Sequence, residues 1–206
     1  IRKSYLAVIF TMLNFFVMFP LITTSNFVYM DNVAGFFILL SLYAWWKSKN
    51  NNNWFWVWGA ATGLAIMTKS IVGFFPLAGI GIYQLVSMDF SFFKAKKFWY
   101  SVLLSLLIVL PWHIYQSIVA GKAFWNNYLI YHVLDRASTN LESNGAPFKF
   151  FFEIVFFRYK STLILFGGTF LASLIFAWKN LTIRFLVITS AVMFLILSIS
   201  ITKLPN

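Results

Sequence analysis

The sequence contains no cysteine and few charged residues. Without cysteine, this stretch of chain has no disulfide framework, no thiolate catalysis and no cysteine-ligated zinc. Charged residues make up 10% of the 206 positions and only five are acidic, whereas an average soluble domain is about 25% charged. Disordered segments need abundant charge and low hydrophobicity, so the composition excludes disorder as well as an ordinary water-soluble globule.

Hydrophobic residues dominate instead, at 61% of the chain, which is typical of a membrane protein. The net charge is +11, and in a soluble chain this excess would indicate nucleic-acid binding. In a membrane protein it reflects the positive-inside rule and pairing with anionic headgroups. We therefore expect a multi-pass protein of the cell membrane whose partners are membrane lipids and not nucleic acid.

The apolar residues form seven continuous runs of about the length that a membrane-crossing helix needs. They do not alternate with polar residues, which excludes barrel strands. Trp54–Met88 holds 35 residues and one charge, Lys69; because one helix of that length would measure about 52 Å, the chain must turn near Lys69. The sequence predicts an all-α, polytopic transmembrane bundle, one unit over residues 1–206, with spans at Tyr5–Ile22, Asn32–Trp46, Trp54–Thr68, Ser70–Met88, Phe98–Ile118, Thr162–Trp178 and Arg184–Ile201.

The basic residues predict which side of the membrane each loop faces. Nine of the 16 lysines and arginines lie at alternate ends of the spans, and we assign these ends to the cytoplasm. Alternation then places Lys69 and a long, partly helical segment, residues 119–161, on the extracytoplasmic side. Within that segment, Phe148–Lys160 is expected to be a helix with Lys149, Glu153 and Lys160 on one face. Five tryptophans around the first cytoplasmic loop predict an aromatic belt at the interface.

Three polar residues at the outer ends of spans are candidates for function. Asp31 opens an apolar span, where the alternative is an ordinary helix-start residue that the helix dipole favours. Lys69 is either a snorkelling lysine or a fixed cation for a phosphate. Lys203 follows the last span, where its alternative role is only to mark the end of a helix. Taken singly, each residue leaves both interpretations open.

Two further candidates lie in the outer segment. His132 and Arg136 are four residues apart, so in a helix they share a face, with Tyr128 one turn earlier. The alternative is a solvated loop. His113 is interpreted as an interfacial histidine with satisfied ring nitrogens, because no second histidine lies at the spacing of a metal site.

These candidates gain weight together, because all of them fall on one side of the membrane and near helix ends. A transporter is expected to place polar groups near mid-membrane, with broken helices and repeats. An acid, an imidazole and several cations at the interface favour chemistry on a lipid phosphate, where cations offset the charge of the leaving group. The rival hypothesis is a multi-span transporter or lipid flippase without transfer chemistry; a membrane scaffold, in which these residues do not converge, is the third.

Five segments also stand out as a set: TTSNFVYMDNVAGFFILLSLYA, GAATGLAIMTKSIVGFFPLAG, LPWHIY, YHVLDRAS and SITKLPN. In this order they resemble the polyprenyl-phosphate-sugar glycosyltransferases of the GT-C class, which include protein O-mannosyltransferases and aminoarabinose transferases. The lysine segment is the most distinctive. The resemblance implies a GT-C-like fold and an enzyme that transfers a sugar from a polyprenyl-phosphate donor to a glycan, lipid or protein acceptor on the extracytoplasmic side.

The resemblance also implies roles for individual residues. Lys69 is similar to the family's lysine near the donor phosphate, and His132 and Arg136 are similar to its outer-loop histidine and arginine. Lys203, in a K-L-P sequence, and Asp31, at a helix start, resemble residues of the same cavity. Lys69, His132, Arg136 and Lys203 are thus expected to bind substrate. Asp31 is expected to support catalysis. No metal ligand is assigned, while a divalent cation is left open as a cofactor.

The chain departs from the family pattern in two places and begins at Ile1. Tyr131 stands where an acid often precedes the histidine, and Ala137 stands where an aromatic residue often follows the arginine. We expect an internal piece of a longer enzyme, whose first outer loop carries the principal acid. Such a piece alone is expected to hold the donor lipid without turning it over.

Overall fold

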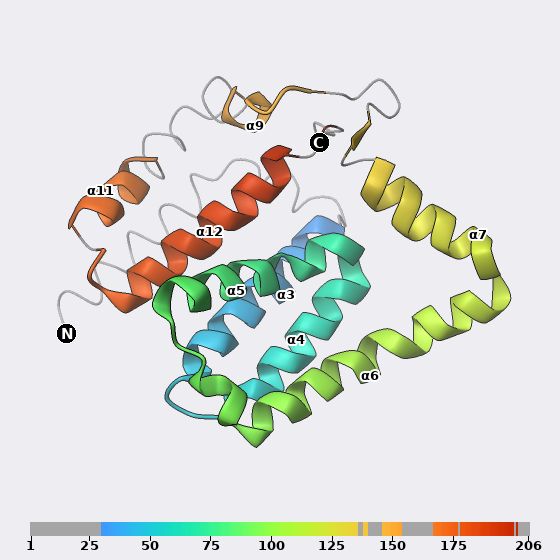
Figure 1. The fold of residues 1–206 in the computed structure, drawn as a ribbon, viewed down its shortest axis with the longest axis horizontal. Helices are drawn as coiled ribbons and strands as arrows, with labels where there is room; N and C mark the ends of the chain where they lie inside the picture. The colour runs from blue at the N-terminus through green and yellow to red at the C-terminus, as the bar shows by residue number, and fades with distance from the viewer. Residues whose placement is uncertain are drawn as a thin grey trace.

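Every secondary-structure element in the described part of the chain is a helix, so the all-α prediction is confirmed. The computed structural model describes residues 30–135, 138–139, 146–153, 167–176, 178–199 and 201 (Figure 1). The α-helices are α3 (Met30–Ser48), α4 (Trp54–Lys69), α5 (Phe75–Ser87), α6 (Lys96–Val119), α7 (Gly121–Trp125), α9 (Phe150–Glu153), α11 (Gly168–Phe176) and α12 (Leu181–Ile199); η1 (Ser70–Phe74) and η2 (Ser91–Lys94) are 3₁₀-helices and η3 (Asn126–Asp135) is a π-helix.

The long helices coincide with predicted spans. α3, α4, α6 and α12 begin and end within three residues of the predicted bounds. The predicted span Thr162–Trp178 is described only as α11, and Tyr5–Ile22 lies outside the described residues, so the count of seven stays a prediction. Within the described part of the chain, three stretches are long and apolar enough to cross a membrane: Trp54–Ser87, Lys96–Val119 and Leu181–Ile199.

The first of these stretches is interrupted at Ser70, which confirms the predicted turn near Lys69. Ser70 has a positive φ of 43°, a conformation that residues other than glycine rarely adopt. The chain then enters η1 and α5, and α4 and α5 leave the turn in different directions (Figure 1). Pro76 lies in the first turn of α5. Proline has no backbone N–H, and the N–H groups of a first turn have no partner within the helix, so proline suits this position.

Gly73 allows η1 to lie directly on the last turns of α4. A Cβ atom at this position would overlap backbone atoms of Ala65 and Ile66, so a larger residue would force the backbone to shift. The backbone of η1 and that of α4 are therefore in contact, and Lys69 is held at the corner between them.

Replacing Gly73 with alanine is expected to destabilise the turn by about 1–3 kcal/mol, because the methyl group overpacks a backbone contact. The measurement is the thermal unfolding midpoint of the purified protein in detergent. The matched control is Gly81→Ala in α5, where a Cβ meets no atom within 4 Å. Equal midpoints for the two variants would contradict this account of the turn.

Small residues bring α4 close to both α3 and α6. On one side, the hydroxyls of Ser41 and Thr62 form a buried hydrogen bond of 2.9 Å between α3 and α4. On the other side, Gly59 lies against the backbone of Ser101 in α6, and Gly63 lies against Ile108. Close backbone approach and interhelical hydrogen bonds are the main sources of helix association in a membrane, so α4 is the central helix of this bundle.

The predicted tryptophan belt is wrong for two of its five members. Trp45 and Trp58 are 2% and 5% exposed and form an aromatic core with Phe98, whose ring stacks on that of Trp58 at 5.5 Å. Trp56, by contrast, is exposed. The belt prediction failed because α3, α4 and the start of α6 bury large rings against one another at this end of the bundle, instead of leaving them at the lipid surface.

The outer segment, residues 119–161, is partly helical in its described parts, as expected. It contains α7, η3 and α9, and Lys149 pairs with Glu153 one turn later at 2.7 Å. The Glu153 carboxylate raises the pKa of Lys149 through a hydrogen bond and its charge. The shared face of these two residues is thus confirmed, while the rest of the predicted helix up to Lys160 lies outside the described residues.

Candidate functional site

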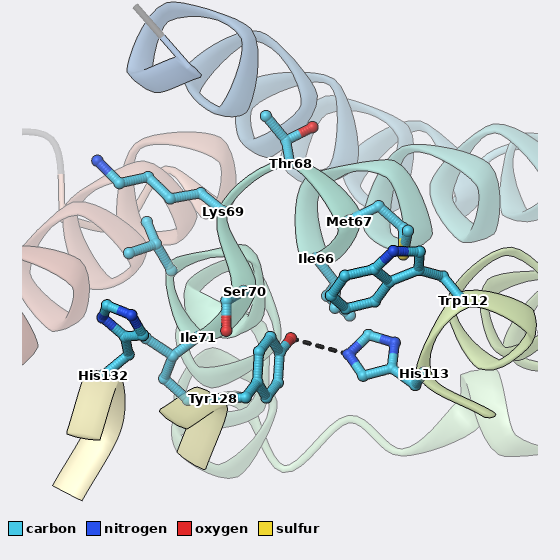
Figure 2. A pocket seen from close by; sticks show the side chains of 11 residues that line it. Ile66, Met67, Thr68, Lys69, Ser70, Ile71, Trp112, His113, Tyr128 and His132 are labelled. Atoms are coloured by element: carbon cyan, nitrogen blue, oxygen red, sulfur yellow. Dashed lines mark hydrogen bonds between the residues drawn. The ribbon is translucent and has the colours of Figure 1, made fainter. Parts of the chain in front are cut away.

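A cavity of about 540 Å³ lies where α4, η1, α6 and η3 meet (Figure 2). The turn after α4 forms one wall, and residues from the second half of α6 and from η3 form the other. The cavity thus joins the end of the α4 span to the outer segment. Its lining residues are Ile66, Met67, Thr68, Lys69, Ser70, Ile71, Val72, Trp112, His113, Tyr128 and His132.

Lys69 forms an ion pair with Asp31 at this end of the bundle. α3 and α4 run antiparallel, so the first turn of α3, which carries Asp31, meets the last turn of α4, which carries Lys69. Both charges suit the helix dipoles, an acid at an N-terminus and a base at a C-terminus. The side chains are 39% and 41% exposed, so the pair is accessible from outside the bundle. Asp31 therefore lies in the first turn of a helix and also contacts Lys69, while its supporting role in catalysis stays a prediction.

His113 and Tyr128 connect the two halves of the opposite wall. The Nδ1 atom of His113 lies 2.8 Å from the carbonyl oxygen of Val109, and a carbonyl only accepts, so Nδ1 carries the proton. In the neutral ring, Nε2 is then the acceptor, and the Tyr128 hydroxyl donates to it at 2.9 Å (Figure 2). The interpretation of His113 as a histidine with satisfied ring nitrogens is confirmed.

Aromatic rings hold η3 against α6. The ring of Tyr128 stacks on Phe124 at 5.1 Å, and Trp112 meets Phe124 edge-on at 5.5 Å. The expected helix over this region exists, but it winds as a π-helix from Asn126 onward. Tyr128 and His132 both face the cavity, as the predicted shared face required. His132 itself is an exposed residue at the mouth.

Three of the five predicted site residues are therefore brought to one end of the bundle: Asp31, Lys69 and His132. Arg136 and Lys203 lie outside the described residues, so their convergence with Lys69 stays a prediction. The π-helical segment ends at Asp135, immediately before Arg136.

The described residues contain no group of three or more His, Asp or Glu side chains that could hold a metal ion. Among the described residues at this end of the bundle, both ring nitrogens of His113 are already engaged by Val109 and Tyr128, and Asp31 with His132 alone is an incomplete ligand set. A divalent cation stays a prediction, and no step is assigned to one.

Sequence reasoning missed Trp112 and His113 as cavity residues, and it named Tyr128 only as a neighbour of His132. The LPWHIY segment was among the distinctive sequences, but a Trp-His pair in an apolar span equally suits lipid-facing or core positions. What determines its place is the aromatic packing of α6 on η3, which the sequence pattern does not encode.

Apolar helices of membrane-crossing length that meet at a cavity with both apolar and polar lining residues define a helical membrane protein with a site at one end of the bundle. The family model described as dolichyl-phosphate-mannose-protein mannosyltransferase matches residues 1–126, more than half of the chain. The chain belongs to this family, and the resemblance stated from the sequence is confirmed.

Two known proteins are similar to the chain. The crystal structure of ArnT from Cupriavidus metallidurans bound to undecaprenyl phosphate matches with a TM-score of 0.75 and 21% identity over 88% of this chain and 34% of that one. The match confirms the GT-C-like fold. An uncharacterized protein from Aquifex aeolicus (strain VF5) is 28% identical over 114 residues, 50% of this chain and 23% of that protein. The chain thus spans less than half the length of either protein.

Replacing Tyr128 with phenylalanine is expected to destabilise the protein by about 0.5–1.5 kcal/mol, because His113 loses its hydroxyl donor while the ring stack on Phe124 is kept. Thermal unfolding in detergent measures the loss. The control is Tyr115→Phe on α6, where the ring is exposed and the change is expected to be neutral. An unfolding midpoint for Tyr128→Phe equal to that of the wild type would show that the hydrogen bond does not hold η3 on α6.

Proposed function

We propose that the protein is a membrane glycosyltransferase that transfers a sugar from a polyprenyl-phosphate donor to an acceptor on the extracytoplasmic side. The observation that carries the proposal is the cavity at the end of α4, where the ion-paired Lys69 lies beside an apolar wall and an exposed histidine. The family membership supports the same reaction class. The acceptor, whether glycan, lipid or protein, is left open.

Lys69 is the proposed cation for the donor phosphate. It lies in the last turn of α4, where the helix dipole places partial negative charge, so an anion approaching this helix end needs a fixed cation. The Asp31 carboxylate holds the ammonium at the mouth of the cavity. A phosphate ester that enters beside the pair shares the Lys69 ammonium with Asp31, and the role of Asp31 is to keep that ammonium in place.

The rest of the cavity suits the other parts of such a donor. Ile66, Met67 and Ile71 provide an apolar surface for the first isoprenoid units. His132 lies at the exposed side, where its imidazole donates a hydrogen bond to a phosphate or sugar oxygen. The Tyr128 hydroxyl donates its proton to His113, so its oxygen lone pairs are free to accept a hydrogen bond from the donor.

The proposed reaction is a displacement at the anomeric carbon of the sugar. The bond from that carbon to the phosphate oxygen breaks, and a bond to the acceptor oxygen forms. Negative charge collects on the departing polyprenyl phosphate, where the Lys69 ammonium stabilises it. The acceptor hydroxyl loses its proton to a base, which we do not assign among the described residues.

The positions of the basic residues support the proposed extracytoplasmic location of the site. Lys47 lies in the last turn of α3 and Lys49 directly after it, while Lys94 ends η2 and Lys96 and Lys97 begin α6. These lysines lie at the end of the bundle opposite the Asp31–Lys69 pair. Lysines concentrate in cytoplasmic loops. The cavity therefore opens toward the other side of the membrane in this proposal.

Lys69→Ala is expected to lower sugar transfer at least about 100-fold, as the loss of one group that stabilises developing charge typically does. Transfer is measured with labelled polyprenyl-phosphate sugars and membranes that carry the protein at its full native length. Membrane insertion is checked on the same preparation. The matched control is Lys122→Ala in α7, an exposed lysine that does not line the cavity.

Wild-type transfer by Lys69→Ala would refute the role of this lysine. Movement of the labelled lipid across the membrane without any transferred sugar would instead favour the flippase and overturn the proposed reaction class.

Sidedness is tested by cysteine labelling, because the chain has no cysteine of its own. Lys122→Cys is expected to react with a membrane-impermeant maleimide in intact cells, and Asn51→Cys is expected to react only after the membrane is opened. Both positions are exposed. The reverse pattern would place the cavity on the cytoplasmic side.

A further inference from the structure

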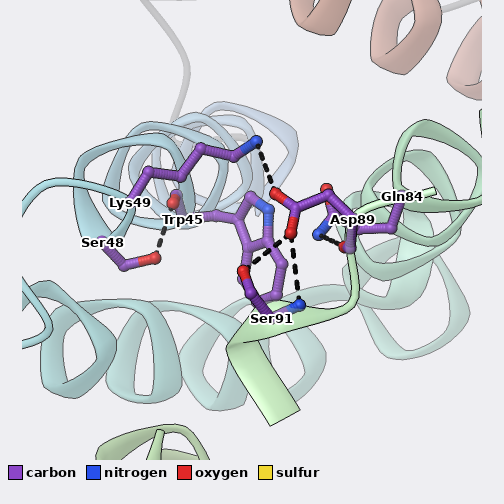
Figure 3. A network of polar contacts seen from close by, with 6 residues as sticks. All are labelled: Trp45, Ser48, Lys49, Gln84, Asp89 and Ser91. Carbon is purple, nitrogen blue, oxygen red and sulfur yellow. Dashed lines mark hydrogen bonds and ion pairs between the residues drawn. The ribbon is translucent and has the colours of Figure 1, made fainter. Parts of the chain in front are cut away.

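A second cavity, of about 290 Å³, lies at the opposite end of the bundle from the Asp31–Lys69 pair. Figure 3 shows the polar contacts among several of its lining residues. It is formed by the end of α3 and the loop after it, the start of α4, the end of α5, and η2. Its floor is aromatic, because Trp45 meets Phe92 and Phe55 edge-on at 4.9 and 5.8 Å. The polar lining residues are Ser48, Lys49, Asn52, Gln84, Asp89, Ser91 and Lys94.

Two deeply buried polar atoms of this lining have no hydrogen-bond partner within the described part of the chain. They are the Nε1 donor of Trp45 and the Oε1 acceptor of Gln84, in residues that are 2% and 3% exposed. A buried donor or acceptor without a partner loses its bonds to water and gains none in return, so these two atoms point to a ligand. The amide nitrogen of Gln84, by contrast, donates to the Asp89 carbonyl oxygen at 2.6 Å.

The charges of the lining are held in place. Ser91 donates to the Asp89 carboxylate from its hydroxyl at 2.7 Å and from its backbone N–H at 3.2 Å. These bonds, with the Lys49 charge, lower the pKa of Asp89. The Lys49 ammonium lies 3.6 Å from that carboxylate, longer than a charge-assisted hydrogen bond of about 2.7–2.9 Å, and sits 4.8 Å from the centre of the Tyr83 ring. The lining thus holds two cations, Lys49 and Lys94, and one anion, Asp89.

We propose that this cavity binds the phosphodiester headgroup of an anionic membrane phospholipid. Lys49, Lys94 and the Trp45 indole N–H supply donors to the phosphate oxygens, and the lining's excess of one positive charge matches one phosphodiester. The Gln84 Oε1 atom accepts from a hydroxyl of the headgroup. This site is separate from the cavity at Lys69 and does not depend on the sugar-transfer proposal.

The position of the cavity favours a lipid over a free phosphate as the source of the anion. It lies where α3, α5 and α6 end or begin, which is the level of the headgroups for helices that cross a bilayer. Lysines at such positions attract anionic lipids. The aromatic floor suits the glycerol part of a lipid, which inorganic phosphate lacks.

The experiment titrates delipidated protein in detergent with phosphatidylglycerol, phosphatidylcholine and inorganic phosphate, and native mass spectrometry counts the bound molecules. We expect one phosphatidylglycerol of highest affinity. Lys94→Gln is expected to weaken its binding about fivefold, while the control Lys96→Gln, an exposed lysine outside the lining, is expected to leave it unchanged. Trp45→Phe keeps an aromatic ring, removes the N–H donor and is expected to weaken binding as well.

Each other outcome overturns the proposal. Inorganic phosphate that binds as tightly as phosphatidylglycerol would show a free-anion site. Equal binding of phosphatidylcholine would show that net headgroup charge is not recognised. Equal losses for Lys94→Gln and Lys96→Gln would show a diffuse electrostatic effect. Because Lys94 is exposed, its substitution does not disturb the core, so this comparison holds even where Trp45→Phe fails to fold.

Discussion

The close packing of α4 between α3 and α6 is the constraint on which the rest of the structure depends. Lipid tails are as apolar as leucine, so burying apolar surface does little to associate helices in a membrane, and contact between backbones matters more. Glycine, serine and threonine on α4 and its neighbours allow that contact, through the Ser41–Thr62 bond on one side and Gly59 on the other. Both ends of α4 are positioned by this packing, and each end borders a cavity.

The two ends differ in chemistry because the loops that close them differ. At one end a tight turn with Gly73 leaves Lys69 at a corner, beside an antiparallel helix that begins with an acid. At the other end, aromatic rings from α3, α4 and η2 fill the interior and leave polar atoms at the rim. A helical bundle in a membrane meets water and headgroups only at its two ends. The polar groups of both cavities therefore lie at the ends of the bundle and not at its middle.

The helices could be predicted from the sequence because the thickness of the bilayer sets the length of each apolar run, and charged residues mark where each run ends. The turn at Lys69 followed from length alone, since Trp54–Met88 is too long for one crossing. The ion pair with Asp31 could not be predicted, because register between two antiparallel helices is set by packing of small side chains. Local charge did suggest that both residues lie on one side, which the pair confirms.

The site was less predictable than the fold. His132 and Tyr128 were placed on one face correctly, but from an assumed α-helix. The segment is a π-helix, and aromatic contacts with α6 decide which residues face inward. The tryptophan belt failed for a related reason, since a sequence does not distinguish rings at a lipid surface from rings buried against other helices. Burial of this kind depends on tertiary neighbours.

The π-helical winding of η3 makes the number of residues in this segment as important as their identity. In such a helix each N–H bonds five residues back, so it accommodates more residues per turn than an α-helix does. Deleting one residue between Trp125 and Tyr128, with the π-helical winding kept, would rotate every later side chain about the helix axis. The chain would keep all its charged residues and a helix in this segment, yet His132 would leave the cavity wall. A change in the number of residues in this segment therefore changes which side chains line the cavity, as replacing several side chains at once would.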